Sequence, residues 1–96
     1  MSLPVVWTPR AVREATRAVA WWVENRPYAP ELLEQELAEA ISRLRISPLI
    51  GTVHKPGIRR LVLERTRYGL YYAVEPGKVR LLAVWSSLRG RAPRLR

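Results

Sequence analysis

Few side chains in this sequence could transfer a proton near neutral pH. His54 is the only histidine, and an imidazole titrates in this range. It lies in a segment rich in proline and glycine, where a lone histidine is more often an exposed bystander than a catalytic group. Glu64 could accept a proton, but its neighbour Arg65 favours a solvated pair in a turn. Catalysis by these two residues is therefore not the favoured interpretation.

Arginine is the most abundant group that could take part in chemistry. A guanidinium has a pKa above about 12, so it can stabilise a phosphate but cannot exchange a proton with it. Tyr71 is the better candidate for proton transfer, because strand alternation should turn it outward. Aromatic stacking or packing on the sheet would explain Tyr71 more simply.

The positive charge is concentrated in the second half of the chain. Residues 1–41 contain four arginines and six glutamates, which gives a net charge of −2. Residues 42–96 contain thirteen lysines and arginines but only Glu64 and Glu75, which gives +11. Such a surface is expected to bind a polyanionic partner, either nucleic acid or an acidic protein segment. The alternative is that the arginines only keep a small domain soluble.

Composition limits the class of protein. Residues 1–96 are expected to form a single small domain with one modest core, and residues 87–96 a basic C-terminal tail. No cysteine is present, which excludes disulfides and thiolate zinc sites, and no glycine loop suited to phosphates occurs, so we expect no cofactor or metal. The N-terminus lacks signal-peptide features, and the longest apolar run, Ala18 to Val23, is too short to cross a bilayer. A cytoplasmic protein without membrane contacts is expected.

Residues 58–85 are expected to form a three-stranded antiparallel meander. Three β-rich segments are separated by turns at Arg65-Thr66-Arg67 and Glu75-Pro76-Gly77. In the middle segment alternation predicts that one set of residues faces inward and the other outward. The inward set is Tyr68, Leu70, Tyr72 and Val74, and the outward set is Gly69, Tyr71 and Ala73.

Two helices are predicted before the meander. Thr8 and Pro9 favour a helix start that extends to about Asn25, with an apolar stripe made of Val12, Ala15, Val19, Trp22 and Val23. A second helix should begin near Pro30 and bury Leu33, Leu37, Ala40, Ile41 and Leu44.

The remaining segments complete the predicted α+β fold. Val5 to Trp7 should add a strand at the edge of the meander, and residues 47–57 read as a loop. The last ten residues should be poorly ordered in isolation. The predicted order is a strand, an antiparallel helical hairpin and three strands, with the helices on one face of the sheet and the other face at least partly open.

Several short motifs follow one another along nearly the whole chain. They are Trp7-Thr8-Pro9, Arg26-Pro27 with Pro30, Leu44 with Pro48 and Gly51, Arg60-Leu61-Val62-Leu63, Tyr68-Gly69-Leu70-Tyr71-Tyr72, Val84-Trp85, and Arg89-Gly90-Arg91-Ala92-Pro93. In this order they resemble the RelE/ParE superfamily of toxins from bacterial type II toxin–antitoxin systems. The resemblance implies a growth inhibitor that forms a hetero-oligomer with a small acidic antitoxin encoded beside it.

The superfamily has two branches, and the resemblance implies a different target for each. RelE-like members cut messenger RNA on the ribosome with a basic cluster, whereas ParE-like members poison DNA gyrase and lack that cluster. Arg60 and Arg89 match two basic positions of the nuclease pattern. The other positions hold residues that lack the required groups, namely Val62, Gly69, Leu95 and Trp85-Ser86-Ser87. A ParE-like or otherwise non-nuclease toxin is therefore predicted.

Two other interpretations stay open. In a RelE-like endoribonuclease, Arg60, Arg80 and Arg89 would bind phosphate and Tyr71 would be the candidate for proton transfer, but no complete catalytic set can be assigned. The third interpretation is a binding module that does not inhibit growth.

The surface that binds antitoxin or target is expected to combine tryptophans with arginines. An acidic amphipathic segment of the antitoxin should cover exposed apolar rings and pair with guanidiniums, although each tryptophan could instead belong to the core. The candidate residues are Trp7, Trp21, Trp85, Arg60, Arg89 and Arg91.

Overall fold

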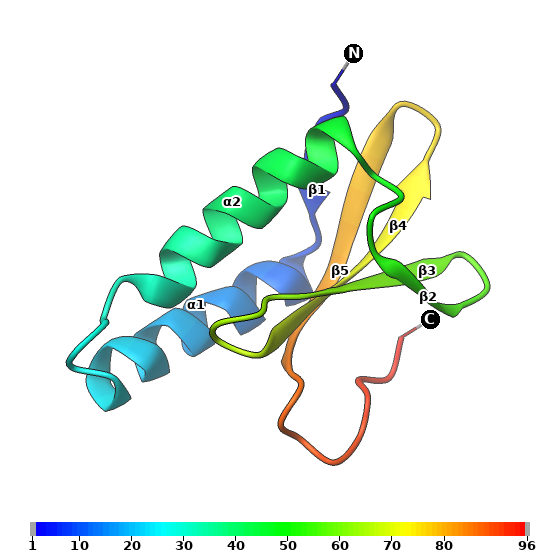
Figure 1. The fold of residues 1–96 in the computed structure, drawn as a ribbon. Coiled ribbons are helices and arrows are strands. Elements are labelled where there is room, and N and C mark those ends of the chain that lie inside the picture. Colours follow the sequence, from blue (N-terminus) through cyan, green and yellow to red (C-terminus); the bar gives the residue numbers. More distant parts are fainter. Residues whose placement is uncertain (1, 96) are drawn as a thin grey trace.

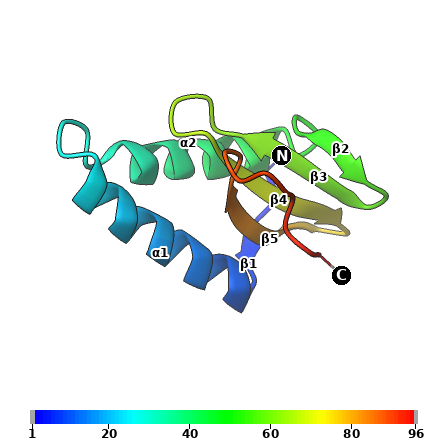
Figure 2. The ribbon, with the colours of Figure 1, turned by 90° about the horizontal axis from the view of Figure 1, so that it is seen from below.

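Two helices pack on one face of a five-stranded mixed sheet in the computed structural model, which describes residues 2–95 (Figures 1 and 2). The elements are β1 (Val5–Trp7), α1 (Pro9–Asn25), α2 (Leu32–Ile46), β2 (Thr52–Lys55), β3 (Ile58–Val62), β4 (Tyr68–Glu75) and β5 (Lys78–Ser86). The strand order is β1-β5-β4-β3-β2, with β1 parallel to β5 and the other pairs antiparallel. The predicted α+β architecture is confirmed. No helix in the described part is long and apolar enough to cross a membrane.

The prediction that residues 47–57 form only a loop was wrong, because β2 lies within this segment. Lys55 pairs with Ile58 around Pro56-Gly57, and Gly57 has a φ of 80°. The same arrangement recurs at Pro76-Gly77, which joins β4 to β5. β2 lies at the sheet edge and most of its side chains are exposed, so it lacks the apolar alternation that marks a half-buried strand.

Helix α1 begins as predicted, and its buried face matches the predicted stripe in part, because Ala15 and Trp22 are buried and Val19 is partly buried. The Thr8 side chain accepts a hydrogen bond from the Ala11 N–H at 3.2 Å. The predicted core residues Val12 and Val23 are 48% and 50% exposed, whereas an alanine stripe with Trp22 faces the sheet. Both stripes have helical spacing, so periodicity alone could not choose between them. The short alanines allow α1 to approach the sheet closely.

The main core lies between the helical hairpin and the sheet. On α2 the predicted Leu33, Leu37, Ala40 and Leu44 are buried, and Ile41 is partly buried. They pack with residues from the inner face of β4 and β5, among them Leu70, Tyr72, Val79 and Leu81. The predicted inward orientation of Leu70 and Tyr72 is confirmed.

The opposite face of the sheet is more covered than predicted. Tyr71 does point away from the helices, but it is only 3% exposed, in a small cluster with Ile58 and Ala83. Leu95 packs against this cluster, and the Lys55 Nζ donates a hydrogen bond to the Leu95 carbonyl at 3.1 Å. Residues 89–95, which we name the C-terminal strap, run back toward β2 and β3 (red in Figures 1 and 2).

The C-terminal tail and Val74 differ from the sequence-based expectations. The strap lies against the body of the protein, so the expectation of a poorly ordered tail is not met for its described residues. Arg96 lies outside the described residues. Val74, predicted to face inward, is 39% exposed because it lies near the end of the β4–β5 hairpin.

A buried hydrogen bond attaches the segment before β2 to the central strand. The Gly51 N–H donates to the Tyr72 hydroxyl at 2.9 Å, and Tyr72 is fully buried. A Cβ atom at Gly51 would lie 2.6 Å from this hydroxyl, so only glycine fits. Burial raises the pKa of Tyr72, and this outweighs the opposing effects of the Gly51 hydrogen bond and of Arg59.

We predict that Tyr72→Phe destabilises the fold by about 1–3 kcal/mol, because the buried Gly51 N–H loses its acceptor. The folded pKa of Tyr72 lies above the unfolded value of about 10, so its contribution to stability is complete below pH 10 and is lost at higher pH. Urea unfolding at pH 7 and pH 10.5 measures both effects. Tyr28→Phe is the matched control, because Tyr28 is fully exposed. Equal stability of the two variants would contradict the prediction.

Candidate functional site

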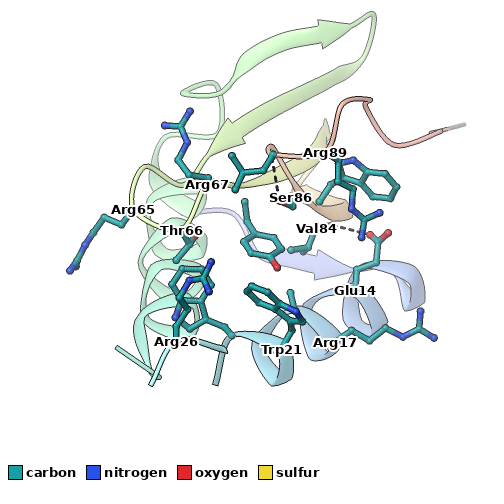
Figure 3. Close-up of a pocket in the computed structure, with 15 residues that line it drawn as sticks. Glu14, Arg17, Trp21, Arg26, Arg65, Thr66, Arg67, Val84, Ser86 and Arg89 are labelled. Carbon is teal, nitrogen blue, oxygen red and sulfur yellow. Dashed lines mark hydrogen bonds between the residues drawn. The ribbon is translucent and has the colours of Figure 1, made fainter. Parts of the chain in front are cut away.

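A groove of about 800 Å³ separates α1 from the end of β5 and the β3–β4 turn (Figure 3). Its apolar lining comes from α1, β4, β5 and the segment after β5, and its polar lining is dominated by arginine. We name it the arginine–tryptophan groove. The lining residues that enter the argument are Trp21, Trp22, Tyr68, Val84, Trp85, Leu88, Arg17, Arg26, Arg65, Arg67, Arg89, Glu14 and Thr66.

Two arginines of the groove lie over tryptophan rings. The Arg26 guanidinium is 4.9 Å from the ring centroid of Trp21 and 5.4 Å from that of Trp22. The Arg89 guanidinium is 4.1 Å from the Trp85 centroid. These cation–π contacts hold the guanidiniums near apolar surface while their N–H groups can still bind an anion.

Among the described residues, Glu14 is the only acidic one that lines the groove. Its carboxylate accepts a hydrogen bond from the Val84 N–H at 3.0 Å and pairs with the Arg10 Nε at 3.2 Å. Because both contacts occupy this carboxylate, it adds little negative charge to the groove. The five arginines therefore give the groove a strongly positive character.

A second glutamate holds the other side of the groove. Glu36, on α2, accepts hydrogen bonds from the backbone N–H groups of Arg65 and Thr66 at 3.0 and 2.9 Å. Arg67 has a φ of 67°, a left-handed conformation that is strained for a residue other than glycine. Its carbonyl accepts a hydrogen bond from the Ser87 N–H at 2.7 Å, which joins this turn to the end of β5.

Tyr68 and Thr66 contribute hydroxyl groups to the lining of the groove. Burial raises the pKa of Tyr68, and Arg89 and then Arg26 oppose this shift. Tyr68 therefore stays protonated at neutral pH and can donate a hydrogen bond. Thr66 is 4% exposed, and its hydroxyl has no hydrogen-bond partner among the described residues.

Only part of the predicted binding surface lies in the groove. Trp21, Trp85 and Arg89 line it, and Arg91 lies 5.9 Å from the Trp85 centroid. The other two candidates lie elsewhere. Trp7 is half-buried against the main core, and Arg60 lies on the opposite face of the sheet beside Gly69.

Sequence reasoning missed four of the arginines in the groove. Arg26 had only marked the end of a helix, and Arg65 and Arg67 only a turn. The sequence did contain one signal for this groove, because Arg26 lies close in sequence to the Trp21-Trp22 pair. Arg17 lies one helical turn before Trp21, which also places them on one side of α1.

The candidate catalytic residues come together only in part. Arg60 lies opposite Tyr71, which is buried and contacts His54 edge-to-face with ring centroids 5.0 Å apart. Arg89 covers Trp85, and Trp85 lies five residues from Arg80 on β5. At about 3.3 Å per residue, this separates the two sites by about 16 Å. Residues 2–95 also contain no cluster of three or more histidine or acidic side chains that could hold a metal ion.

Comparison with known families decides the assignment. The sequence model of the "ParE toxin of type II toxin-antitoxin system, parDE" matches residues 5–90 of this chain. The chain belongs to the ParE toxin family. The main prediction, a ParE-like toxin of a type II toxin–antitoxin system, is confirmed, and the comparisons do not favour the RelE-like alternative. Membership of this family also indicates an antitoxin as a partner.

A solved structure supports the fold of this ParE-family toxin. It comes from the chromosomal ParDE toxin–antitoxin system of P. aeruginosa and superposes with a TM-score of 0.74. The match covers 88% of this chain and 96% of the other at 20% sequence identity, so it concerns the fold alone. A search of curated protein sequences gave no match.

We predict that Glu36→Ala destabilises this toxin by about 1–3 kcal/mol, because two N–H groups of the β3–β4 turn lose their acceptor. Glu39→Ala, an exposed position on the same helix, should change stability by less than about 0.5 kcal/mol. Chemical denaturation of both variants measures the difference. The proposed role of Glu36 would be wrong if the two variants unfolded at the same urea concentration.

Proposed function

We propose that an acidic, amphipathic segment of the antitoxin neutralises this ParE-family toxin by occupying the arginine–tryptophan groove. The observation that supports this is the combination of five arginines, an apolar lining and a single, already engaged carboxylate. Carboxylates on one side of a partner helix or strand would pair with the guanidiniums. Apolar side chains on its other side would cover Trp21 and Leu88, which are 45% and 76% exposed.

Apolar contact should supply most of the affinity in this groove. Exposed ion pairs contribute little because water and salt screen them, whereas burial of a large aromatic side chain stabilises an interface strongly. Trp21 is therefore expected to be the most important single residue. The arginines are expected to select an acidic partner and to speed its association.

We also propose that DNA gyrase is the target of this toxin. The resemblance to ParE-like toxins implies gyrase. Two observations argue against RNA cleavage by this chain: Tyr71, beside Arg60, is only 3% exposed, and Arg80 lies about 16 Å along β5 from the Trp85 ring that Arg89 covers. Cleavage of RNA needs an acid, a base and cations around one phosphate. Inhibition of a protein target needs only a binding surface.

We predict that Trp21→Ala weakens antitoxin binding by about tenfold to a hundredfold. The probe is the full-length protein encoded next to this toxin, and the measurement is isothermal titration calorimetry. Val23→Ala removes apolar surface from an exposed position of the same helix outside the groove and should leave Kd unchanged.

Arg17→Glu should likewise weaken binding by about tenfold or more, and Arg13→Glu by less than about threefold, because only Arg17 lines the groove. Equal effects within either pair would contradict the proposed site.

The target is tested separately by expressing the toxin without its antitoxin. We expect inhibition of supercoiling by purified gyrase and double-strand breaks in cells, with intact messenger RNA. Cleaved messages with intact DNA would contradict the gyrase proposal and support a RelE-like nuclease. Growth without arrest would contradict it in favour of a harmless binding module.

A further inference from the structure

Three guanidiniums surround the Trp85 ring where the C-terminal strap begins. Those of Arg89, Arg10 and Arg91 lie 4.1, 5.9 and 5.9 Å from its centroid. The Trp85 Nε1–H donates a hydrogen bond to the Arg91 carbonyl at 2.9 Å, which fixes the strap against the ring. The ring therefore organises a compact cationic cluster that two different parts of the chain build. We name these three arginines the Trp85 cluster.

Within residues 2–95, Arg10 is the only arginine of this cluster that has an acidic partner. Glu14 pairs with Arg10, and the only other ion pair within residues 2–95 joins Lys78 to Glu75 in the β4–β5 hairpin. Arg10 also donates to the Arg94 carbonyl, which brings a fourth guanidinium-bearing residue to the same side. Arg89, Arg91 and Arg94 are exposed, so their N–H groups are available to an anion.

The surroundings of the cluster indicate which polyanion it fits. A partner peptide would bury apolar side chains. The exposed Leu88 beside the cluster lines the arginine–tryptophan groove, and none of the other exposed large apolar residues lies between residues 89 and 95. A single-stranded nucleic acid would stack its bases on exposed aromatic rings. Neither aromatic ring on this face is free for stacking, because Arg89 covers the Trp85 ring and Tyr71 is buried beneath the strap. The large exposed side chains of the C-terminal strap are those of Arg89, Arg91 and Arg94, and their guanidiniums suit the phosphates of a duplex.

We propose that the Trp85 cluster binds the phosphate backbone of duplex DNA without sequence preference. All three guanidinium carbons lie within 5.9 Å of one centroid, so no two are more than about 12 Å apart, which equals the rise of about three to four nucleotides along one strand. The cluster can therefore contact neighbouring phosphates at once. Arg89 and Trp85 also line the arginine–tryptophan groove, so the inference concerns the toxin without its antitoxin, and it does not depend on gyrase.

Fluorescence anisotropy with a labelled 20-base-pair duplex tests the proposal. If three phosphates are neutralised, log Kobs should fall with log[salt] with a slope of about −2.7, so affinity should drop about 40-fold between 50 and 200 mM salt. In the double variant Arg89→Ala/Arg91→Ala the slope should be about 1.8 less steep, and the affinity should drop only about 3.5-fold over the same salt range. Arg89→Lys/Arg91→Lys keeps both charges and should retain the original slope. A second duplex of unrelated sequence should bind equally well.

The matched control is Arg43→Ala/Arg45→Ala, which removes the same charge from the last turn of α2. It should keep the original slope. Circular dichroism checks that each variant is folded, and if the double alanine variant is not, Arg91→Ala alone should make the slope about 0.9 less steep.

Three results would overturn the proposal. They are no DNA binding at 50 mM salt, an equal loss of slope in the control, and displacement of DNA by polyglutamate as effective as by unlabelled duplex of the same charge. The last result would identify a general anion site that an acidic protein could use. Stronger binding of single-stranded DNA of equal charge would also contradict it.

Discussion

The hydrogen bond from the Val84 N–H to the Glu14 carboxylate joins α1 to the end of β5 at the arginine–tryptophan groove. Strand β1 has only three residues and pairs with β5 from Val79 to Leu81, so the outer edge of β5 is unpaired beyond that point. The Glu14 carboxylate accepts the hydrogen bond of a backbone N–H on this edge, so that no further strand is needed there. The end of β5 therefore stays open to the groove, and Glu36 holds the opposite side by the same kind of bond to the β3–β4 turn. Both sides of the groove thus depend on carboxylates of the helices accepting N–H groups of the sheet.

These two bonds also explain why the surface is so positive. The helical half of the chain contains most of the glutamates, and those nearest the groove bind backbone N–H groups or Arg10. Arg26 and Arg89 lie over tryptophan rings, and Arg26 also donates a hydrogen bond to the Asn25 carbonyl. Stacking on tryptophan holds a guanidinium in place without neutralising it. A surface built in this way is stable alone and still attracts an anionic partner, which is the property that a toxin controlled by an antitoxin requires.

Local signals in the sequence predicted much of the fold, and long-range packing produced the rest. The Thr8 cap, the Pro76-Gly77 turn and the inward Leu70 and Tyr72 were all visible in the sequence. The exposed strand β2 was missed because an edge strand buries no alternate side chains. The groove could not be predicted, because Arg26, Arg65 and Arg89 are far apart in the chain and meet only when α1 packs beside β5. The position of the strap could not be predicted either. Its hydrogen bonds are accepted by backbone carbonyls, which every residue type has. Membership of the ParE family followed from the order of weak motifs and not from any single one.

The central claim is that the antitoxin silences this toxin by filling the arginine–tryptophan groove. The four tryptophans report on it directly, because three line the groove and Trp7 packs against the main core. The most direct measurement is a titration of toxin carrying ¹⁵N-labelled tryptophan with its antitoxin, followed by the four indole N–H signals in NMR spectra. Our account predicts that the signals of Trp21, Trp22 and Trp85 shift or broaden while that of Trp7 stays in place. A large change at Trp7 with the other three signals unchanged would contradict it.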